Sequence, residues 1–384
     1  MKFAVVTTSR ADYSHLYWPL KELDGHPDLD LKLIVLGSHL SPEFGRTVSE
    51  IERDGFAIAA SLECLLSSDS DTGMAKSIGV AVLSLADCLA AMRPDVLLLI
   101  ADRYEMLAPA SVALALRIPI AHIEGGEISR GAIDDAVRNA LTKMSHIHFT
   151  STAGARRRVI ALGEEPWRVH RAGAPSIDHL SKSRLLSKTE IEQALQIRLA
   201  IPTVVVAYHP VTLLDDTNAE AEELLSALAR IPHQLIFCHP NADAGSRDLR
   251  ERMRSFLAER GSGRLFVNLP VIQYWSLLRH ADLMIGNSSS GIMETASFAL
   301  PTINVGMRQQ GRERAKNVLD AQPTSASILE CVQRATDPSF RASLAGMTNP
   351  YGDGHAAERI VEVLTTLPPR ERLLVKLDPE AVSS

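Results

Sequence analysis

The sequence is poor in cysteine and in long apolar runs, and each shortage excludes a class of protein. Its 384 residues include 4 cysteines, whose spacings match neither a zinc-binding pattern nor a CxxC pair: Cys64, Cys88, Cys238 and Cys331. This usage predicts reduced, mostly buried thiols in a cytoplasmic protein. No apolar run reaches the ~18 residues that span a bilayer, and the apolar N-terminus is too short for a signal peptide. We therefore expect no membrane partner.

Two further absences concern ligands. The formal net charge is −6, so the sequence has no excess of positive charge. This argues against a basic face that binds nucleic acid, but it is compatible with a local phosphate site. The sequence also lacks a GxGxxG dinucleotide fingerprint after its first strand and the lysine of a P-loop. The apolar fraction of 46% and the charged fraction of 22% are ordinary for a globular enzyme.

What the sequence does have is an alternation of short apolar runs with longer amphipathic segments, in two series separated by a polar stretch at 173–187. This alternation predicts parallel strands joined by crossover helices. We predict an α/β fold of two doubly wound, Rossmann-like domains around a central cleft, over 1–175 and 188–365, with a tail over 366–384. The last helix of the second domain, 355–364, can pack back on the first. The predicted strands are 3–6, 31–36, 96–100, 118–123, 147–150, 203–207, 234–237, 264–267, 283–285 and 302–305, and the predicted helices include 14–23, 44–54, 74–92, 107–116, 134–144, 153–162, 220–229, 246–259, 274–280, 292–299 and 325–335.

The most informative stretch is Gly286–Gly291 (GNSSSG), which follows an apolar strand and precedes a predicted helix. At a helix N-terminus the unpaired N–H groups and the helix dipole favour an anion, and glycine lets the backbone approach it closely. The alternative is a helix cap with spare serines. We favour the phosphate site.

Carboxylates follow the strands of the first predicted domain. Asp102 comes directly after one strand and Glu124 after the next, while Asp134 and Asp135 open a helix. Asp102 could instead cap the next helix, and one of the two adjacent aspartates is expected to be an N-cap, leaving the other free to act. After the first strand, Arg10 and Ser14 could reach a phosphate, or Ser9 or Asp12 could simply cap a helix.

Donors that suit phosphate follow the strands of the second predicted domain, namely His209, Asn241, Ser288, Ser289 and Arg308. Because the strands of one parallel sheet end at one rim, these groups favour an anionic ligand. The division between the halves suggests a nucleoside diphosphate on the second domain and acid–base chemistry on the first.

Together these motifs resemble the hydrolysing UDP-N-acetylglucosamine 2-epimerases, which supply N-acetylmannosamine for sialic and related nonulosonic acids. The resemblance covers roughly residues 2–364. It rests on Ser9–Tyr13 (SRADY), Asp102–Glu105 (DRYE), His122–Glu127 (HIEGGE), Ala132–Asp135 (AIDD), His209–Thr212 (HPVT), Asn241–Gly245 (NADAG), Gly286–Gly291 (GNSSSG) and Tyr351–Gly354 (YGDG).

The resemblance implies the GT-B architecture and a reaction without a metal or another cofactor. Removal of the proton at sugar carbon 2 and expulsion of UDP leave a 2-acetamidoglucal. Water then adds at carbon 1 and a proton returns to carbon 2 on the other face. This is a hydrolase-type epimerase activity on a small nucleotide sugar, and we expect a homo-oligomer, either a dimer or a tetramer.

The motif positions also imply roles for individual residues. Asp102, Glu124 and Asp134 correspond to catalytic carboxylates, and His209 to a histidine that stabilises the leaving phosphate. Which carboxylate takes the carbon 2 proton and which returns it stays open. The implied ligand contacts are Arg10, Ser14, Arg103, Asn241, Ser288, Ser289, Glu294 and Arg308, with Glu294 suited to the ribose hydroxyls.

Three alternatives remain at this stage. His39–Gly45 and Leu65–Asp69 resemble members that act on UDP-N,N′-diacetylbacillosamine in legionaminic acid pathways. A GT-B glycosyltransferase would share the nucleotide site but has no use for three carboxylates around carbon 2. A non-catalytic nucleotide-sugar sensor could lose Asp102 or Asp134, and both are present.

Overall fold

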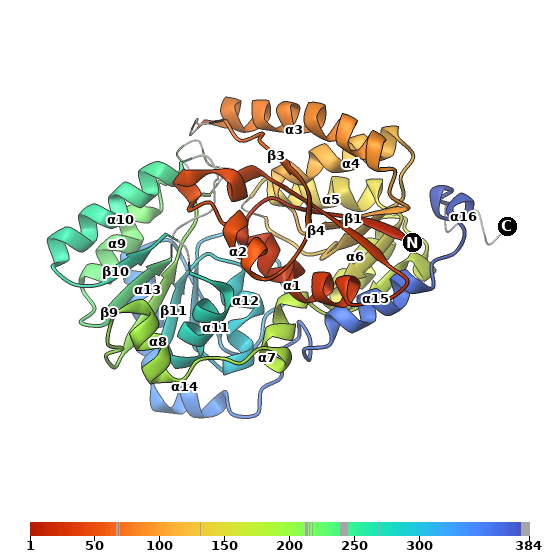
Figure 1. Cartoon of the computed structure of the whole chain (residues 1–384). Coiled ribbons are helices and arrows are strands. Elements are labelled where there is room, and N and C mark those ends of the chain that lie inside the picture. Colours follow the sequence, from red (N-terminus) through yellow and green to blue (C-terminus); the bar gives the residue numbers. More distant parts are fainter. Residues whose placement is uncertain are drawn as a thin grey trace. The chain divides into compact units, whose positions relative to one another are not determined.

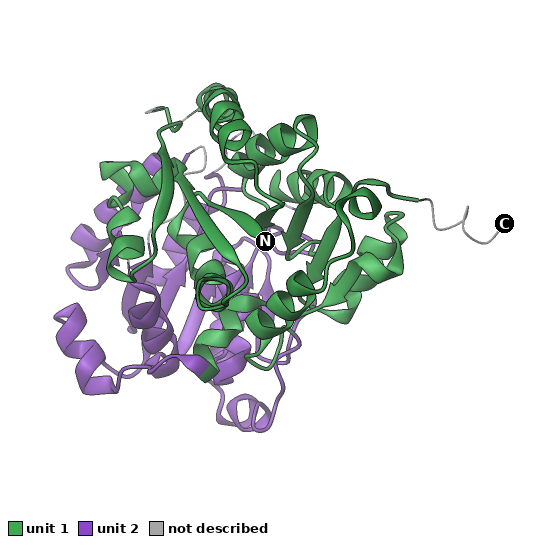
Figure 2. Cartoon of the chain, turned by 45° about the vertical axis from the view of Figure 1, so that its right-hand side comes forward, with its two compact units in different colours: residues 1–127, 133–181, 351–384 green, residues 128–132, 182–350 purple. Residues whose placement is uncertain are grey.

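The chain forms two compact units, coloured separately in Figure 2. Unit 1 comprises residues 1–127, 133–181 and 351–384, and unit 2 comprises residues 128–132 and 182–350. The computed structural model describes residues 1–66, 68, 70–130, 132–211, 214, 216, 218–238, 245–267 and 269–377.

Unit 1 is built on a seven-stranded parallel sheet in the order β3-β2-β1-β4-β5-β6-β7 (Figure 1). Its strands are β1 Lys2–Thr7, β2 Asp30–Leu36, β3 Ile58–Leu62, β4 Val96–Ile100, β5 Ile120–Ile123, β6 Ile147–Thr150 and β7 Val169–Arg171. Its α-helices are α1 Arg10–Asp24, α2 Val48–Arg53, α3 Asp71–Met92, α4 Leu107–Ala115, α5 Asp134–Met144, α6 Ala153–Ala161, α7 Asp178–Lys182, α15 Ala356–Thr365 and α16 Arg370–Leu374. Its 3-10 turns are η1 Gly37–Leu40, η2 Pro42–Phe44, η3 Tyr104–Met106, η4 Pro166–Arg168 and η5 Pro175–Ile177.

Unit 2 is built on a six-stranded parallel sheet in the order β10-β9-β8-β11-β12-β13. Its strands are β8 Thr203–Ala207, β9 Gln234–Cys238, β10 Arg264–Phe266, β11 Leu283–Gly286, β12 Thr302–Val305 and β13 Val318–Ala321. Its helices are α8 Lys188–Leu195, α9 Ala221–Ala229, α10 Ser246–Arg260, α11 Val271–His280, α12 Ser290–Met293, η6 Thr295–Phe298, α13 Ser325–Thr336 and α14 Pro338–Ser343.

The strand orders locate the point in each sheet where ligands bind. In a doubly wound sheet the crevice lies at the carboxyl ends of the strands, where the strand order reverses. In unit 1 that point lies between β1 and β4, and in unit 2 it lies between β8 and β11. The loops that follow these four strands are therefore the expected place of a ligand.

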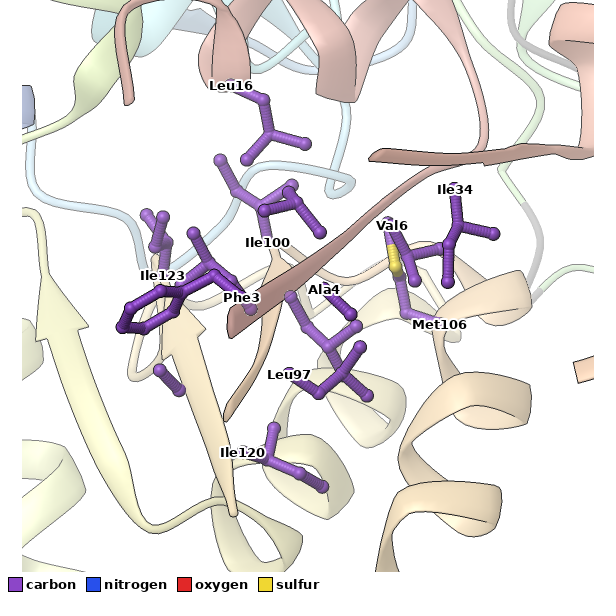
Figure 3. Close-up of a cluster of buried hydrophobic side chains, with 14 of the residues drawn as sticks. Phe3, Ala4, Val6, Leu16, Ile34, Leu97, Ile100, Met106, Ile120 and Ile123 are labelled. Carbon is purple, nitrogen blue, oxygen red and sulfur yellow. The ribbon is translucent and has the colours of Figure 1, made fainter. Parts of the chain in front are cut away.

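The core of unit 1 explains why its central strands are apolar along their whole length. Figure 3 shows Phe3, Ala4 and Val6 of β1 packed with side chains of the neighbouring strands and helices. Every residue of β4 is buried, because helices cover both faces of a parallel sheet.

All ten predicted strands are confirmed, and the three that the sequence missed share one property. The missed strands are β3, β7 and β13, and each of them lies at an edge of its sheet. An edge strand is covered less completely than a central one, so its sequence carries a weaker apolar signal. β3, for example, alternates between half-buried and exposed residues.

Two predicted helices are each replaced by two shorter elements. The expected helix at 44–54 is a 3-10 turn followed by α2, because Gly45 takes a left-handed conformation (φ 82°) between them. The expected helix at 292–299 is α12, of only four residues, followed by η6.

The C-terminal segment belongs to unit 1. The sequence analysis assigned residues up to 365 to the second domain but allowed the last helix to pack back on the first, and α15 lies with unit 1. The carboxylate of Asp178 accepts the backbone N–H groups of Ala356 and Ala357 at the start of α15. Arg168 is fully buried and donates to the carbonyl oxygen of Leu373 at 2.9 Å. The tail is thereby attached as far as residue 377.

One helix is long and apolar enough to pass a length-and-composition test for a membrane span. It is α3, a 22-residue helix, most of which is not buried. A single helix of this kind is weak evidence of a membrane span, since the core helix of a soluble protein and a signal sequence pass the same test.

Candidate active site

The carboxyl end of β4 holds a carboxylate that is paired with a buried arginine. Asp102 and Asp135 both accept hydrogen bonds from the guanidinium of Arg138, and Asp135 does so at 3.2 Å. Arg138 is 1% exposed and also donates to the carbonyl oxygen of Glu127 at 2.8 Å. Asp102 therefore does not cap the following helix, whose N-cap position is occupied by Arg103.

Neither of the adjacent aspartates of α5 is its N-cap, so that expectation is wrong. The N-cap residue is Ile133, and Asp134 and Asp135 both lie in the first turn of the helix. There the helix dipole favours negative charge. Asp135 sits three residues before Arg138 and pairs with it on the same helical face.

The backbone before Asp102 and at Glu124 takes an unusual conformation. Ala101 has φ 60° and Glu124 has φ 66°, in the left-handed region that residues with a side chain seldom adopt. His122 donates its Nε2–H to the carbonyl oxygen of Ala101 at 2.8 Å. Burial lowers the pKa of His122 to about 4, so this imidazole stays neutral and holds the turn as a hydrogen-bond donor. Backbone strain of this kind is typical of functional sites.

Glu124 pairs with a histidine that the sequence analysis did not single out. The Nδ1 atom of His15, on α1, lies 2.7 Å from Oε1 of Glu124. The two side chains are 16% and 7% exposed. The pair joins groups that are 109 residues apart in the chain.

The turn after β1 forms a helix cap, which is one of the two interpretations that the sequence analysis offered for it. Ser9 is the N-cap of α1 and forms a capping box with Asp12. The cap extends α1 back to Arg10, four residues before the predicted start. The Ser14 hydroxyl donates to the carbonyl oxygen of Ala11 at 2.6 Å. Arg10 is half-buried at the first position of the helix.

The side chain of Arg103 pairs with that of Glu105, two residues later in the chain. Its guanidinium donates to both carboxylate oxygens of Glu105, at 3.2 and 3.0 Å. Both side chains are buried.

In unit 2 a single residue links the loops that follow three strands, through its side-chain amide and its backbone carbonyl group. Asn287, after β11, accepts the N–H of His209 at 2.7 Å and donates to its carbonyl oxygen at 2.8 Å. The carbonyl oxygen of Asn287 accepts bonds from Arg308 at 3.2 Å and Gln309 at 2.9 Å, after β12. Gly286 makes the close approach possible, because a Cβ atom there would collide with the carbonyl oxygen of Ala207 on β8.

The serine run continues into a small hydrogen-bonded cluster. Ser288 and Ser289 are half-buried, and Ser289 is the N-cap residue of α12. The hydroxyl of Ser290 donates to Glu294 at 2.6 Å and lies 2.7 Å from the hydroxyl of Tyr274. Glu294, predicted to face ribose, is 4% exposed.

The structure thus brings the predicted residues of each unit to one end of its own sheet. Unit 1 gathers Asp102, Glu124 and Asp134 after β4 and β5, and unit 2 gathers His209, Ser288, Ser289 and Arg308 after β8, β11 and β12. Some positions used in the sequence analysis lie outside the described residues: Ser67, Asp69, Thr212, the four residues 241–244 with Asn241, and residues 378–384 of the tail. In the part of the chain that the structure describes, no group of three or more His, Cys, Asp or Glu side chains is placed to hold a metal ion.

Three residues of the site were missed as site residues, namely His15, Arg138 and Asn287. Arg138 could have been found, because it lies three and four residues after Asp135 and Asp134 on a predicted helix. Asn287 lies within the serine-rich stretch but was not assigned a role. His15 had no local signal, because its partner is distant in the chain.

Comparison with known proteins places this chain in a family. The sequence profile of the UDP-N-acetylglucosamine 2-epimerase family matches residues 21–365. A GDP/UDP-N,N′-diacetylbacillosamine 2-epimerase (hydrolyzing) of Campylobacter jejuni is 38% identical over 324 residues, which are 84% of each chain. A UDP-N,N′-diacetylbacillosamine 2-epimerase (hydrolyzing) of Legionella pneumophila is 35% identical over 98% of each chain.

A solved structure shares the fold. The UDP-GlcNAc 2-epimerase of Neisseria meningitidis, solved bound to UDP-GlcNAc, aligns with a TM-score of 0.81 over 96% of this chain and 100% of that one, at 19% identity. The fold of the two units is therefore the GT-B fold of these enzymes.

Proposed function

Since the chain belongs to the UDP-N-acetylglucosamine 2-epimerase family, we propose that it is a hydrolysing 2-epimerase that converts UDP-N-acetylglucosamine and water into N-acetylmannosamine and UDP. The observation that carries this proposal is the pair of carboxylates at the ends of the neighbouring strands β4 and β5. Asp102 and Glu124 are held there by strained backbone and have different partners, Arg138 and His15. Epimerisation at carbon 2 needs one group that removes a proton and another that returns it.

In the proposed first step, a carboxylate of unit 1 removes the proton at carbon 2 while UDP leaves from carbon 1, which gives a 2-acetamidoglucal. In the second step, water adds at carbon 1 and a carboxylic acid returns a proton to carbon 2 on the opposite face. The candidates for these roles are Asp102, Glu124 and Asp134, each within unit 1. The water becomes the hydroxyl at carbon 1, so the products are UDP and the free 2-epimeric sugar.

We assign the leaving diphosphate to unit 2. The donors proposed for it are His209, Ser288, Ser289 and Arg308, with Asn241, Arg10, Arg103 and Ser14 as further ligand contacts and Glu294 at the ribose. Asn287 would hold the loops that carry His209 and Arg308 in place. Donors that are fixed before the reaction stabilise developing charge without reorganising, which is the usual source of such catalysis.

A second substrate is favoured by the comparisons. Two of the most similar relatives are named for UDP-N,N′-diacetylbacillosamine, at 38% and 35% identity. That sugar differs from N-acetylglucosamine at carbons 4 and 6, so the same chemistry at carbon 2 would apply. Either product would enter the synthesis of a sialic or related nonulosonic acid in the cytoplasm.

The function is tested by incubating the protein with each nucleotide sugar alone and analysing the products. Free UDP with a 2-epimeric free sugar supports the hydrolysing epimerase, and the faster substrate identifies the natural one. UDP-N-acetylmannosamine would instead show a non-hydrolysing epimerase. Absence of turnover on both substrates would leave a glycosyltransferase or a nucleotide-sugar sensor.

We expect the double variant Ser288→Ala, Ser289→Ala to weaken UDP binding by ~1–3 kcal/mol, the scale for lost hydrogen bonds to a charged group. Calorimetric titration with UDP measures this. Ser343→Ala, on α14 of the same unit, serves as the control and should bind as the wild type does. An unchanged UDP dissociation constant in the double variant would mean that the two serines only cap a helix and do not bind phosphate.

We also propose a homo-oligomer that assembles through α3 and α4, which pack against each other. Leu83 on α3 is 74% exposed and Leu114 on α4 is 54% exposed, and α3 is more apolar than a solvated helix should be. Leu83→Glu should dissociate the dimer or tetramer in sedimentation velocity, because a carboxylate would be buried without a partner. Ile201→Glu, at a residue of similar exposure, is the control. A wild-type protein that sediments as a monomer would contradict the proposal.

A further inference from the structure

The two carboxylates at the ends of β4 and β5 have partners of opposite proton chemistry. Asp102 is paired with Arg138, and an arginine stays protonated at every pH at which proteins are folded. Glu124 is paired with His15, whose imidazole has two ring nitrogens and can bind a proton at one while releasing a proton from the other. Of these two carboxylates, Glu124 therefore has the partner that can exchange a proton with it.

The turn of α1 that carries His15 is held by a second, buried histidine. Nδ1 of His179 accepts a hydrogen bond from the indole N–H of Trp18 at 3.2 Å. An indole nitrogen can only donate, so the proton of His179 is on Nε2, which donates to the carbonyl oxygen of Ser14 at 3.0 Å. Burial lowers the pKa of His179 to about 4, which keeps this imidazole neutral. His179 thus anchors α1 at Ser14, the residue before His15, without exchanging protons itself.

Glu124 is also held in place, through its backbone. Its backbone N–H donates to the carbonyl oxygen of Phe149 on β6 at 2.7 Å, and its φ of 66° directs the side chain away from the path of the strand. Its carboxylate is 7% exposed, whereas the imidazole of His15 is 16% exposed. His15 is therefore the member of the pair that is nearer to water.

From these contacts we infer that His15 acts through Glu124, by relaying protons between this carboxylate and solvent. The inference rests on the proposed function, because that reaction removes one proton from carbon 2 and returns another on the opposite face. The group that acted as base ends a turnover protonated and the group that acted as acid ends it ionised. Both must be reset before the next turnover.

The relay conserves every atom. When Glu124 is protonated, Nδ1 of His15 takes the proton from Oε1, and the imidazolium then loses its Nε2 proton to water. The neutral imidazole is left with its proton on Nδ1, so it has to return to the tautomer protonated on Nε2 before it can take another proton from Glu124. Uptake of a proton from water at Nε2 and release of the Nδ1 proton to water restore that tautomer. The reverse sequence loads Glu124 with a proton from water, and neither direction needs another reactant.

The test compares two substitutions of His15 in the full-length protein. His15→Ala removes the imidazole and leaves space for a small molecule. His15→Asn keeps a donor where Nδ1 lies, so it preserves the hydrogen bond to Glu124 but cannot carry a proton. The matched control is His355→Ala, which breaks an exposed histidine–glutamate pair of 3.0 Å on α15.

We expect both His15 variants to lose at least ~100-fold in kcat, with KM and the UDP dissociation constant within a few-fold of wild type, the scale for a lost proton-transfer group. Added imidazole should restore kcat of His15→Ala by at least ~10-fold and leave His15→Asn unchanged, since the asparagine fills the space. His355→Ala should match the wild type.

Wild-type turnover in His15→Asn would show that His15 only orients Glu124, and it would overturn the relay. A lack of rescue by imidazole in folded His15→Ala would overturn it as well. If His15→Ala does not fold, the nearly isosteric His15→Asn decides the question through its kcat. Failure of the proposed function is distinguishable, because the wild type itself would then release no UDP from either nucleotide sugar.

Discussion

Asp102→Asn should lower turnover by at least ~100-fold, the usual loss when a general acid or base is removed. Asparagine keeps the size of the side chain and can still accept a hydrogen bond from Arg138, so the turn after β4 should persist. What it loses is the negative charge and the ability to hold a proton. The groups proposed to bind UDP lie mainly in unit 2, so UDP affinity should stay within a few-fold of the wild type. The rate of UDP release and calorimetric titration with UDP measure the two effects.

Asp135→Asn is the matched control for Asp102→Asn, because Asp135 accepts a hydrogen bond from the same guanidinium at 3.2 Å. It changes the charge balance around Arg138 without removing the proposed acid–base group, and we expect nearly normal turnover. An equal loss in both variants would mean that the charge of Arg138, and not proton transfer, is responsible. Nearly normal turnover in folded Asp102→Asn would remove this residue from the mechanism.

The second large effect is expected from Gly286→Ala, which should lower the free energy of unfolding by at least ~3 kcal/mol, the combined scale of a strained backbone and an overpacked core. Gly286 has φ 149°, and its Cβ position overlaps the carbonyl oxygen of Ala207, its partner in the register of β11 with β8. The colliding group is backbone, so it cannot turn aside as a flexible side chain would. The two strands would have to separate beside the contacts between Asn287 and His209.

Gly79→Ala on α3 is the control for this substitution. A Cβ atom at Gly79 meets no atom within 4 Å, so alanine should stabilise the helix by up to ~1 kcal/mol. Denaturant unfolding measures both variants, and UDP titration shows whether the site of unit 2 survives. A Gly286→Ala protein as stable as the wild type would mean that this close approach is not required.

The sequence determined the architecture because a central strand of a parallel sheet is buried on both faces and has to be apolar. This rule predicted β4, β8 and β11, and with them the positions of Asp102 and of the serine run directly after a strand. It did not predict β3 or β13, which lie at sheet edges where the requirement for burial is weaker.

Local contacts could be predicted only in part, even where the partners are close in sequence. The sequence offered Ser9 or Asp12 as a helix cap, and the structure joins both in one capping box, whereas the pair of Asp135 and Arg138 on one helical face was not predicted. The N-cap of α5 was misjudged, because the chain places Ile133 at that position and both aspartates inside the helix.

What only the tertiary structure decided is the partner of each carboxylate. Glu124 meets His15 across 109 residues of chain and Asp102 meets Arg138 across 36. Such long-range contacts cannot be predicted from the periodicity of a sequence. They depend on which strands become neighbours and on how each helix packs back on the sheet. The sequence by itself determined which acidic groups stand at the strand ends. The fold decided that one faces an arginine and the other a histidine, because the strand order β1-β4-β5 brings α1 and α5 to the same end of the sheet.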